Sequence, residues 1–486
     1  MSKQILGDVF IYLPAKLLPA IIGILTIPVL THLLSPVEYG KYVLGATSLS
    51  LISVVCISGL VSIVLRFNIV KGTKNLHEFI KPLLLISLTA GFLIWVSSVR
   101  FWSGPANDTL FVTVGVIWLI AQAFYEYFLG WSRARNLAKI YSIAVSWRSI
   151  GGFLLAIIFL SFEPKSGVVV FLATAIIMLT GLTILPHFAL RLNDNADSEN
   201  YSKCDKKLLF RYGISAAIVN VVLLALSSAD RFIIGILMDA ESVAIYGANY
   251  DLAEKPIFFI NSLLLLSSSV IGIRIFEQEG EINAASFLTK LIRFYLLVAP
   301  PLAMTLAVLS DLIVELFLPK FYIAGAVVLP FVAIGGIFVG IMHRYSLLLS
   351  FHKRTDTIII CSVGALCVNL FACWVLIPQM GLVGAAISTS IAYLALLFFV
   401  RMAALKYHCP RFPWITFWRV IASIAIAATA MIAMLHNLLW SRPIVLAFSF
   451  CSGMIIYTAC LYFLKEFSTQ DIRSFNKRIA GRLHKL

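Results

Sequence analysis

Basic side chains in the middle of long apolar segments are the residues of this sequence with the clearest chemical potential. Four of them, Lys16, Arg148, Arg231 and Lys255, lie well inside such segments. A charge exposed to the hydrocarbon core of a membrane costs at least about 2.5–3.5 kcal/mol, so these side chains are expected to face a bundle interior or a water-filled cavity. Arg and Lys are the usual partners of phosphate groups. A cavity lined by them would suit an anionic solute.

Acidic side chains accompany the basic ones in the same apolar segments. Four of them lie there: Glu126, Asp230, Asp251 and Glu254. A carboxyl group shielded from water holds a proton more readily, so these groups are candidate ion carriers. Asp251 and Lys255 are four residues apart, a spacing at which two helical side chains can neutralise each other. Asp230 and Arg231 are neighbours that point about 100° apart on a helix, which disfavours pairing between them.

The basic and acidic groups inside the segments balance, so the sequence does not by itself prove a positive cavity. Arg66, Arg293 and Arg344, close to segment ends, could make it positive on one side. Any one of these charges could equally belong to a structural ion pair. The set favours a function, because its members come from both halves of the chain and duplicated transporters bind substrates between such halves.

The elements that position these residues are predicted to be membrane-spanning helices. The chain has 486 residues, of which 60% are hydrophobic and only 13% are charged. Soluble domains carry about 25% charged residues, so this chain cannot supply the polar shells that soluble domains need. Its apolar runs exceed 18 residues without alternation, which excludes open sheets. About fourteen spans are expected, at 9–30, 42–65, 79–99, 109–130, 138–160, 167–190, 212–236, 245–272, 286–309, 323–347, 355–377, 381–400, 414–435 and 442–464.

The distribution of basic residues predicts the orientation of the spans. The net charge is +15, and most of the 38 Lys and Arg residues fall in loops on the side of the N-terminus. Because cytoplasmic loops collect Lys and Arg, both termini are expected in the cytoplasm. The same rule accounts for the net positive charge, so this charge does not indicate a protein that binds nucleic acid. The first apolar run is too long for a signal peptide and is predicted to be the first span.

Motifs for cofactors and catalysis are missing from the sequence. It contains no glycine-rich nucleotide-binding motif and no H-E-x-x-H, and its eight cysteines form no C-x-x-C pair. No predicted loop exceeds about 20 residues, which leaves no room for a folded catalytic domain. We therefore expect a protein that is not an enzyme and that needs no metal or cofactor.

The polar segment 193–210 divides the chain into two halves. It separates a predicted six-helix bundle, 1–192, from a second one, 211–405. Two further spans follow in 406–464, and the basic tail 465–486 is expected to form an amphipathic cytoplasmic helix. Tyr-Gly and a further Tyr stand at the start of the second span, near 39–42, and again at the start of the eighth, near 246–250, which indicates a duplication. In the first copy, Ser35 and Glu38 have capping-box spacing with Pro36 at the first helical position.

Three short segments resemble a known family. They are LSPVEYGKY at 34–42, ADRFII at 229–234 followed by Tyr-Gly at 246–247, and IPQMGLVGAAIST at 377–389. Together they resemble the polysaccharide transporter family, specifically Wzx-type O-antigen flippases of the MATE-like (MOP) superfamily. The resemblance implies an all-α membrane protein with two pseudo-symmetric six-helix bundles around a central cavity. It also implies transfer of an undecaprenyl-pyrophosphate-linked oligosaccharide from the cytoplasmic to the periplasmic leaflet of the bacterial inner membrane by alternating access, coupled to the movement of an ion.

Nine of these charged residues receive an expected role from the resemblance. Phosphate attraction is assigned to Lys16, Arg148, Arg231, Lys255, Arg66 and Arg293. Ion coupling is assigned to Glu126, Asp230 and Glu254. The expected partners are the lipid-linked oligosaccharide, membrane lipids, a polysaccharide polymerase and a chain-length regulator. Two alternatives stay open, a drug or cation antiporter of the same fold and a membrane polysaccharide polymerase or acyltransferase, and the polymer could be a capsule or wall polymer instead of O-antigen.

Overall fold

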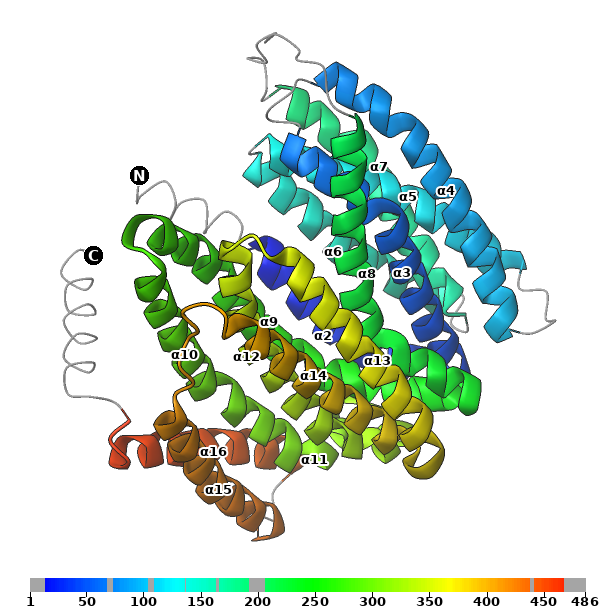
Figure 1. Ribbon diagram of the computed structural model, residues 1–486. Coiled ribbons are helices and arrows are strands. Elements are labelled where there is room, and N and C mark those ends of the chain that lie inside the picture. The colour runs from blue at the N-terminus through cyan, green and yellow to red at the C-terminus, as the bar shows by residue number, and fades with distance from the viewer. Residues whose placement is uncertain are drawn as a thin grey trace. The chain divides into compact units, whose positions relative to one another are not determined.

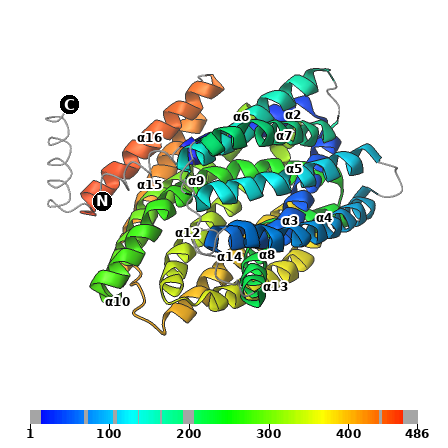
Figure 2. The same ribbon diagram turned by 90° about the horizontal axis from the view of Figure 1, so that it is seen from above.

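The computed structural model describes residues 14–67, 73–103, 109–135, 137–162, 166–191, 206–437 and 441–466 (Figures 1 and 2). All regular elements of these residues are helices. The helices are α2 (Pro14–Leu33), α3 (Pro36–Phe67), α4 (Thr73–Ser103), α5 (Thr109–Ala134), α6 (Ala138–Phe162), α7 (Val168–Arg191), α8 (Lys206–Leu237), α9 (Ala240–Glu279), α10 (Glu281–Val308), α11 (Ser310–Phe317), the 3-10 helix η1 (Lys320–Val328), α12 (Leu329–Phe351), α13 (Thr355–Met380), α14 (Leu382–Ala404), α15 (Trp414–Asn437) and α16 (Arg442–Phe463).

The predicted all-α membrane architecture is confirmed. In the parts of the chain that the structure describes, thirteen segments are long and apolar enough to cross a membrane. Every predicted span overlaps a helix. Thirteen of the fourteen predicted spans correspond to these segments, and the remaining one, 245–272, lies in α9. The sequence analysis did not predict the short helix α11 or the separate 3-10 helix η1 before α12. The predicted tail helix lies outside the described residues beyond residue 466.

The first of two compact units comprises residues 1–255, 318–325 and 359–392. Within it α3 packs against α4, α5 and α8, while α7 packs against α5 and α6, and α2 lies on α6 (Figure 1). One core cluster joins α5, α6 and α7 through Tyr125, Met178 and small buried residues that include Ala121, Ala144 and Ala175. Small side chains let membrane helices approach closely, so this cluster fixes the α5–α7 packing that carries part of the site.

The second unit comprises residues 256–317, 326–358 and 393–486. In it α10 packs against α12 and α15, and α15 and α16 form a helical pair. Tyr295 of α10 lies against the backbone of α12 and donates a hydrogen bond to the Gly336 carbonyl oxygen at 3.0 Å. The boundaries of the two predicted six-helix bundles, 1–192 and 211–405, stay a prediction.

The two helices that begin at the repeated Tyr-Gly segments have matching N-terminal caps. The Ser35 hydroxyl accepts the Glu38 backbone N–H at 3.3 Å at the start of α3. The Asp239 carboxylate accepts the Ser242 backbone N–H at 2.7 Å at the start of α9. Both are capping hydrogen bonds to an otherwise unpaired helical donor.

The Glu38 carboxylate connects α3 to the start of α7. It accepts the backbone N–H of Gly167 at 3.1 Å, so it holds the start of α7 beside α3.

The glycines of the two Tyr-Gly segments pack against each other's helices in the first unit. A Cβ added to Gly40 of α3 would overlap the backbone carbonyl oxygen of Ala240, at the start of α9. A Cβ added to Gly247 of α9 would lie 2.9 Å from the side chain of Val43 in α3. The repeated glycines therefore allow the N-terminal parts of α3 and α9 to touch, which gives the sequence repeat a structural reason.

Candidate functional site

A shared carboxylate links two cations on α8 and α9. Arg231 Nη2 lies 2.6 Å from Asp251 Oδ1, and Lys255 Nζ lies 3.0 Å from Asp251 Oδ2. The i, i+4 pairing expected for Asp251 and Lys255 is thus present. Arg231 reaches across to α9 instead of pairing with its neighbour Asp230, as helix geometry predicts. Asp251 therefore neutralises two cations with its two oxygens.

This triad also contacts α2 and an aromatic ring. Lys255 Nζ donates a hydrogen bond to the Gly23 carbonyl oxygen at 2.9 Å. The guanidinium carbon of Arg231 lies 4.9 Å from the centre of the Tyr250 ring, within cation–π range. A residue larger than glycine at position 23 would contact the stem of Lys255. The charged cluster therefore ties together the three helices α2, α8 and α9.

Asp230 lies in a different environment from the triad. It is almost fully buried and accepts hydrogen bonds from the Tyr246 hydroxyl, from Thr389 Oγ1 at 3.0 Å and from the Arg231 backbone N–H at 2.8 Å. None of the ion pairs found among the described residues includes Asp230. A buried carboxylate held by neutral donors can exchange a proton or a small cation without breaking an ion pair. Glu254, one turn after Tyr250, accepts a hydrogen bond from its hydroxyl at 3.2 Å.

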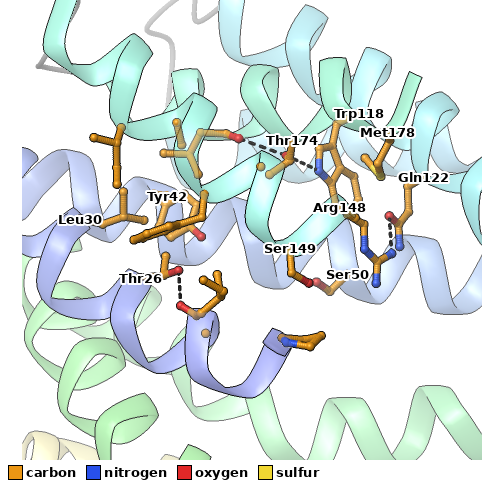
Figure 3. Close-up of a pocket in the computed structure, with 18 residues that line it drawn as sticks. Thr26, Leu30, Tyr42, Ser50, Trp118, Gln122, Arg148, Ser149, Thr174 and Met178 are labelled. Atoms are coloured by element: carbon orange, nitrogen blue, oxygen red, sulfur yellow. Dashed lines mark hydrogen bonds between the residues drawn. The ribbon is translucent and has the colours of Figure 1, made fainter. Parts of the chain in front are cut away.

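A pocket of about 380 Å³ opens inside the first unit (Figure 3). Its lining comes from α2, α3, α5, α6 and α7. Arg148 of α6 faces it and forms an ion pair of 2.8 Å with Glu126 of α5. Gln122, one turn before Glu126, donates a hydrogen bond to that carboxylate at 3.2 Å and accepts a longer contact of 3.5 Å from Arg148. The charged side chain that lines the pocket, Arg148, is therefore neutralised by Glu126 and bordered by the Gln122 amide.

The second unit holds two buried charged side chains, those of Glu466 and Arg344. The Arg293 Nε group lies 2.8 Å from Glu466, whose carboxylate also pairs with Arg419 at 2.9 Å. Arg344 is fully buried, donates to the Asn261 side chain, and stacks 4.2 Å from the centre of the Tyr295 ring. Arg344 takes part in none of the ion pairs found among the described residues. The sequence placed it near the end of a span and did not predict its burial.

A comparison with protein families identifies the relatives of this chain. A family model described as "Polysaccharide biosynthesis protein" matches residues 5–270, more than half of the sequence. The chain belongs to this family. No relative was found among curated proteins.

Solved structures with a similar fold include a lipid II flippase, a MATE transporter and a transporter of the MOP superfamily. The lipid II flippase MurJ in an inward closed conformation matches this chain with a TM-score of 0.68 and 16% identity, over 93% of this chain and 98% of that chain. A MATE transporter in a straight conformation matches with a TM-score of 0.58 and 13% identity, over 82% and 96%. A MOP superfamily transporter from Pyrococcus furiosus matches with a TM-score of 0.55 and 12% identity, over 82% and 98%. At these identities the likeness establishes the fold.

The predicted site residues of this family member lie in several separate environments. Arg231 and Lys255 meet on Asp251, and Arg148, which lines the pocket, pairs with Glu126. Asp230 and Glu254 lie in the first unit with separate hydroxyl partners, and Arg293 is paired in the second unit. Lys16 is exposed near the start of α2, and Arg66 falls in the last turn of α3 with a side chain outside the described residues.

Sequence reasoning missed the hydroxyl groups that hold Asp230. Tyr246 belongs to the repeated Tyr-Gly segment, so the repeat was a signal for it, but nothing in the local sequence of α14 marks Thr389. Gln122 could be found from its position one turn before Glu126. Among the residues that the structure describes, no group of three or more His, Cys, Asp and Glu side chains is arranged to hold a metal ion.

Proposed function

We propose that this protein is a flippase that moves an oligosaccharide linked to undecaprenyl pyrophosphate across the bacterial inner membrane. Membership of the polysaccharide biosynthesis family and the MOP fold support the proposal, and the related fold of MurJ belongs to a protein named as a lipid II flippase. A pyrophosphate with sugars cannot cross hydrocarbon unaided, because burial of its charge and hydroxyl groups is prohibitive. A protein path that opens to one side at a time solves this problem, with both chain termini in the cytoplasm.

The observation that carries the proposal is the double pairing of Asp251. Its two oxygens hold Arg231 and Lys255 in the first unit, in a cluster of partly exposed side chains. Two cations share one carboxylate in this cluster, so it keeps one uncompensated positive charge that can attract a pyrophosphate oxygen while Asp251 stays in place. We assign phosphate attraction to Arg231 and Lys255, and also to Lys16, Arg66 and Arg293. Arg148, which Glu126 already neutralises, is assigned to binding of another part of the substrate.

Ion coupling is proposed to act through carboxyl groups in the first unit. Asp230 is the strongest candidate because its partners are the neutral hydroxyl groups of Tyr246 and Thr389 and a backbone N–H. Glu126 and Glu254 are the further candidates. Occupation of Asp230 by a proton or cation would change the hydrogen bonds between α8, α9 and α14, and so couple ion movement to helix movement. The chain is proposed to act as a transporter and not as an enzyme. Its proposed protein partners are a polysaccharide polymerase and a chain-length regulator.

Reconstituted vesicles test this proposal. Purified protein in vesicles should transfer undecaprenyl-pyrophosphate-linked oligosaccharide between leaflets, measured as sugar that becomes accessible to an external oxidising reagent. Replacement of Lys16, Arg148, Arg231 and Lys255 by Ala should abolish transfer. Asp230→Asn should remove its dependence on an imposed ion gradient. Transfer that survives the fourfold replacement would refute the assigned roles, and efflux of an organic cation without lipid transfer would establish the antiporter instead.

A further inference from the structure

The pocket of the first unit is chemically balanced. Its charged lining group, Arg148, is neutralised by Glu126 at 2.8 Å. The lining also carries the hydroxyl groups of Thr26, Tyr42 and Ser149. Thr26 and Ser149 donate to carbonyl oxygens of their own helices, at 2.6 and 2.9 Å, so each keeps its oxygen available as an acceptor. The pocket thus offers both donors and acceptors without net charge.

Apolar and aromatic groups complete the same pocket. Trp118 is fixed by a hydrogen bond from its Nε1 to Thr174 Oγ1 at 3.0 Å, and Figure 3 shows it with Gln122 and Arg148 among the lining side chains. Phe153 and Met178 add apolar surface. A pocket of about 380 Å³ with a few placed polar groups among apolar ones has the character of a small-molecule site.

We propose that this pocket binds an uncharged sugar ring of the transported oligosaccharide; the assignment rests on the proposed flippase function. A sugar ring has hydroxyl groups that both donate and accept, and C–H faces that pack on an aromatic ring such as Trp118. A free phosphate would have to compete with Glu126 for Arg148, at the cost of an established ion pair. A lipid chain would bury the polar lining without hydrogen bonds, which is unfavourable.

Two serines on α6 provide a matched pair of variants. Ser149 lines the pocket, whereas Ser161 is exposed at the end of the helix, and each hydroxyl donates to the carbonyl oxygen four residues earlier at 2.9 Å. Ser149→Leu fills part of the pocket, and Ser161→Leu makes the same chemical change outside it. Gln122→Met is a second pocket variant, which removes the amide while it keeps the length of the side chain.

The experiment measures binding to the full-length protein in lipid nanodiscs. The probes are undecaprenyl pyrophosphate alone and a panel of the same lipid with one hexose or N-acetylhexosamine attached. The wild-type protein should bind at least one glycosylated probe more tightly than the bare lipid. Ser149→Leu should weaken that probe by about tenfold and leave the bare lipid within about twofold. Gln122→Met should act in the same direction, and Ser161→Leu should change neither affinity.

The possible failures are distinguishable. Equal weakening of both probes by Ser149→Leu, or no weakening of either, would overturn the sugar assignment and leave the flippase proposal intact. The same holds if no sugar in the panel improves wild-type binding over the bare lipid. If the wild-type protein binds neither kind of lipid, the flippase proposal itself fails, and the pocket assignment fails with it.

Discussion

Arg231 and Asp251 form an ion pair between two different helices, with 2.6 Å between Nη2 and Oδ1. The second oxygen of the same carboxylate pairs with Lys255. One acid therefore compensates two cations, and the stability of this part of the first unit depends on it more than on either cation.

Asp251→Asn is expected to destabilise the protein by about 2 kcal/mol, because it leaves two partly buried cations without a charged partner. Thermal unfolding of the purified protein in detergent measures this. Asp356→Asn is the control, since Asp356 is exposed and lies 4.0 Å from Arg354. An exposed pair contributes at most about 1 kcal/mol. Equal effects of the two substitutions would contradict the bridging role of Asp251.

Thr389→Val should shift the ion concentration at which transport is half-maximal. The substitution keeps the shape of the side chain but removes one of the three hydrogen-bond donors to the buried Asp230 carboxylate. A hydrogen bond to a charged group contributes about 1.5–3 kcal/mol, which corresponds to a shift of more than tenfold in the half-saturating ion concentration. Transport in vesicles at graded ion concentrations measures the shift.

Thr429→Val is the matched control for this prediction. Thr429 is exposed on α15, and its hydroxyl lies 2.9 Å from the Ile426 carbonyl oxygen of its own helix, as the Thr389 hydroxyl lies 3.2 Å from that of Ala385. It should leave the ion dependence unchanged. If Thr389→Val transports with the wild-type ion dependence, Asp230 does not carry the coupling ion.

The helices were predictable from sequence because their signal is local. Runs of apolar residues longer than 18 identify spans whatever the rest of the chain does. The Ser35 cap and the Asp251–Lys255 pair also depend on spacing within one helix, and the structure contains both. Such features need no knowledge of how helices pack.

The partners that cross between helices were not predictable. Thr389 reaches Asp230 across 159 positions, and Glu466 reaches Arg293 across 173 positions. The spacing of residues along a single sequence does not show which distant helices pack together. The sequence therefore identified Asp230 and Arg293 as unusual charges but could not say that hydroxyl groups hold the first and an acid holds the second.

The pairing of Glu466 predicts a pH-dependent stability in the second unit. Burial by itself would raise the pKa of Glu466, but hydrogen bonds from Thr416, Arg419 and Arg293 outweigh it and hold the pKa below its usual value. A carboxyl group with a lowered folded-state pKa stabilises the fold above its unfolded-state pKa, about 4.3. This contribution is lost as the pH falls through the lower folded-state value.

Glu466→Gln should therefore cost about 3 kcal/mol at pH 7, and the difference from the wild-type protein should shrink as the pH falls below about 4. Thermal unfolding in detergent across this pH range measures the difference. Glu315→Gln is the control, because Glu315 is partly exposed and 3.6 Å from Arg442. A deficit that stays constant down to acid pH would show that the charge of Glu466 does not stabilise the fold.

The same substitution at two glycines should have effects of opposite sign. Gly40→Ala places a methyl group against the Ala240 carbonyl oxygen, and a backbone atom cannot move aside, so a loss of about 1–3 kcal/mol is expected. At Gly235 of α8 the nearest atoms to an added Cβ are side-chain carbons of Leu44 and Val243 at 3.4–3.5 Å, an ordinary contact distance. Gly235→Ala should stabilise the helix by about 0.5–1 kcal/mol, because alanine favours helices over glycine. Thermal unfolding of both variants tests the close approach of α3 and α9, which would be refuted if Gly40→Ala were as stable as Gly235→Ala.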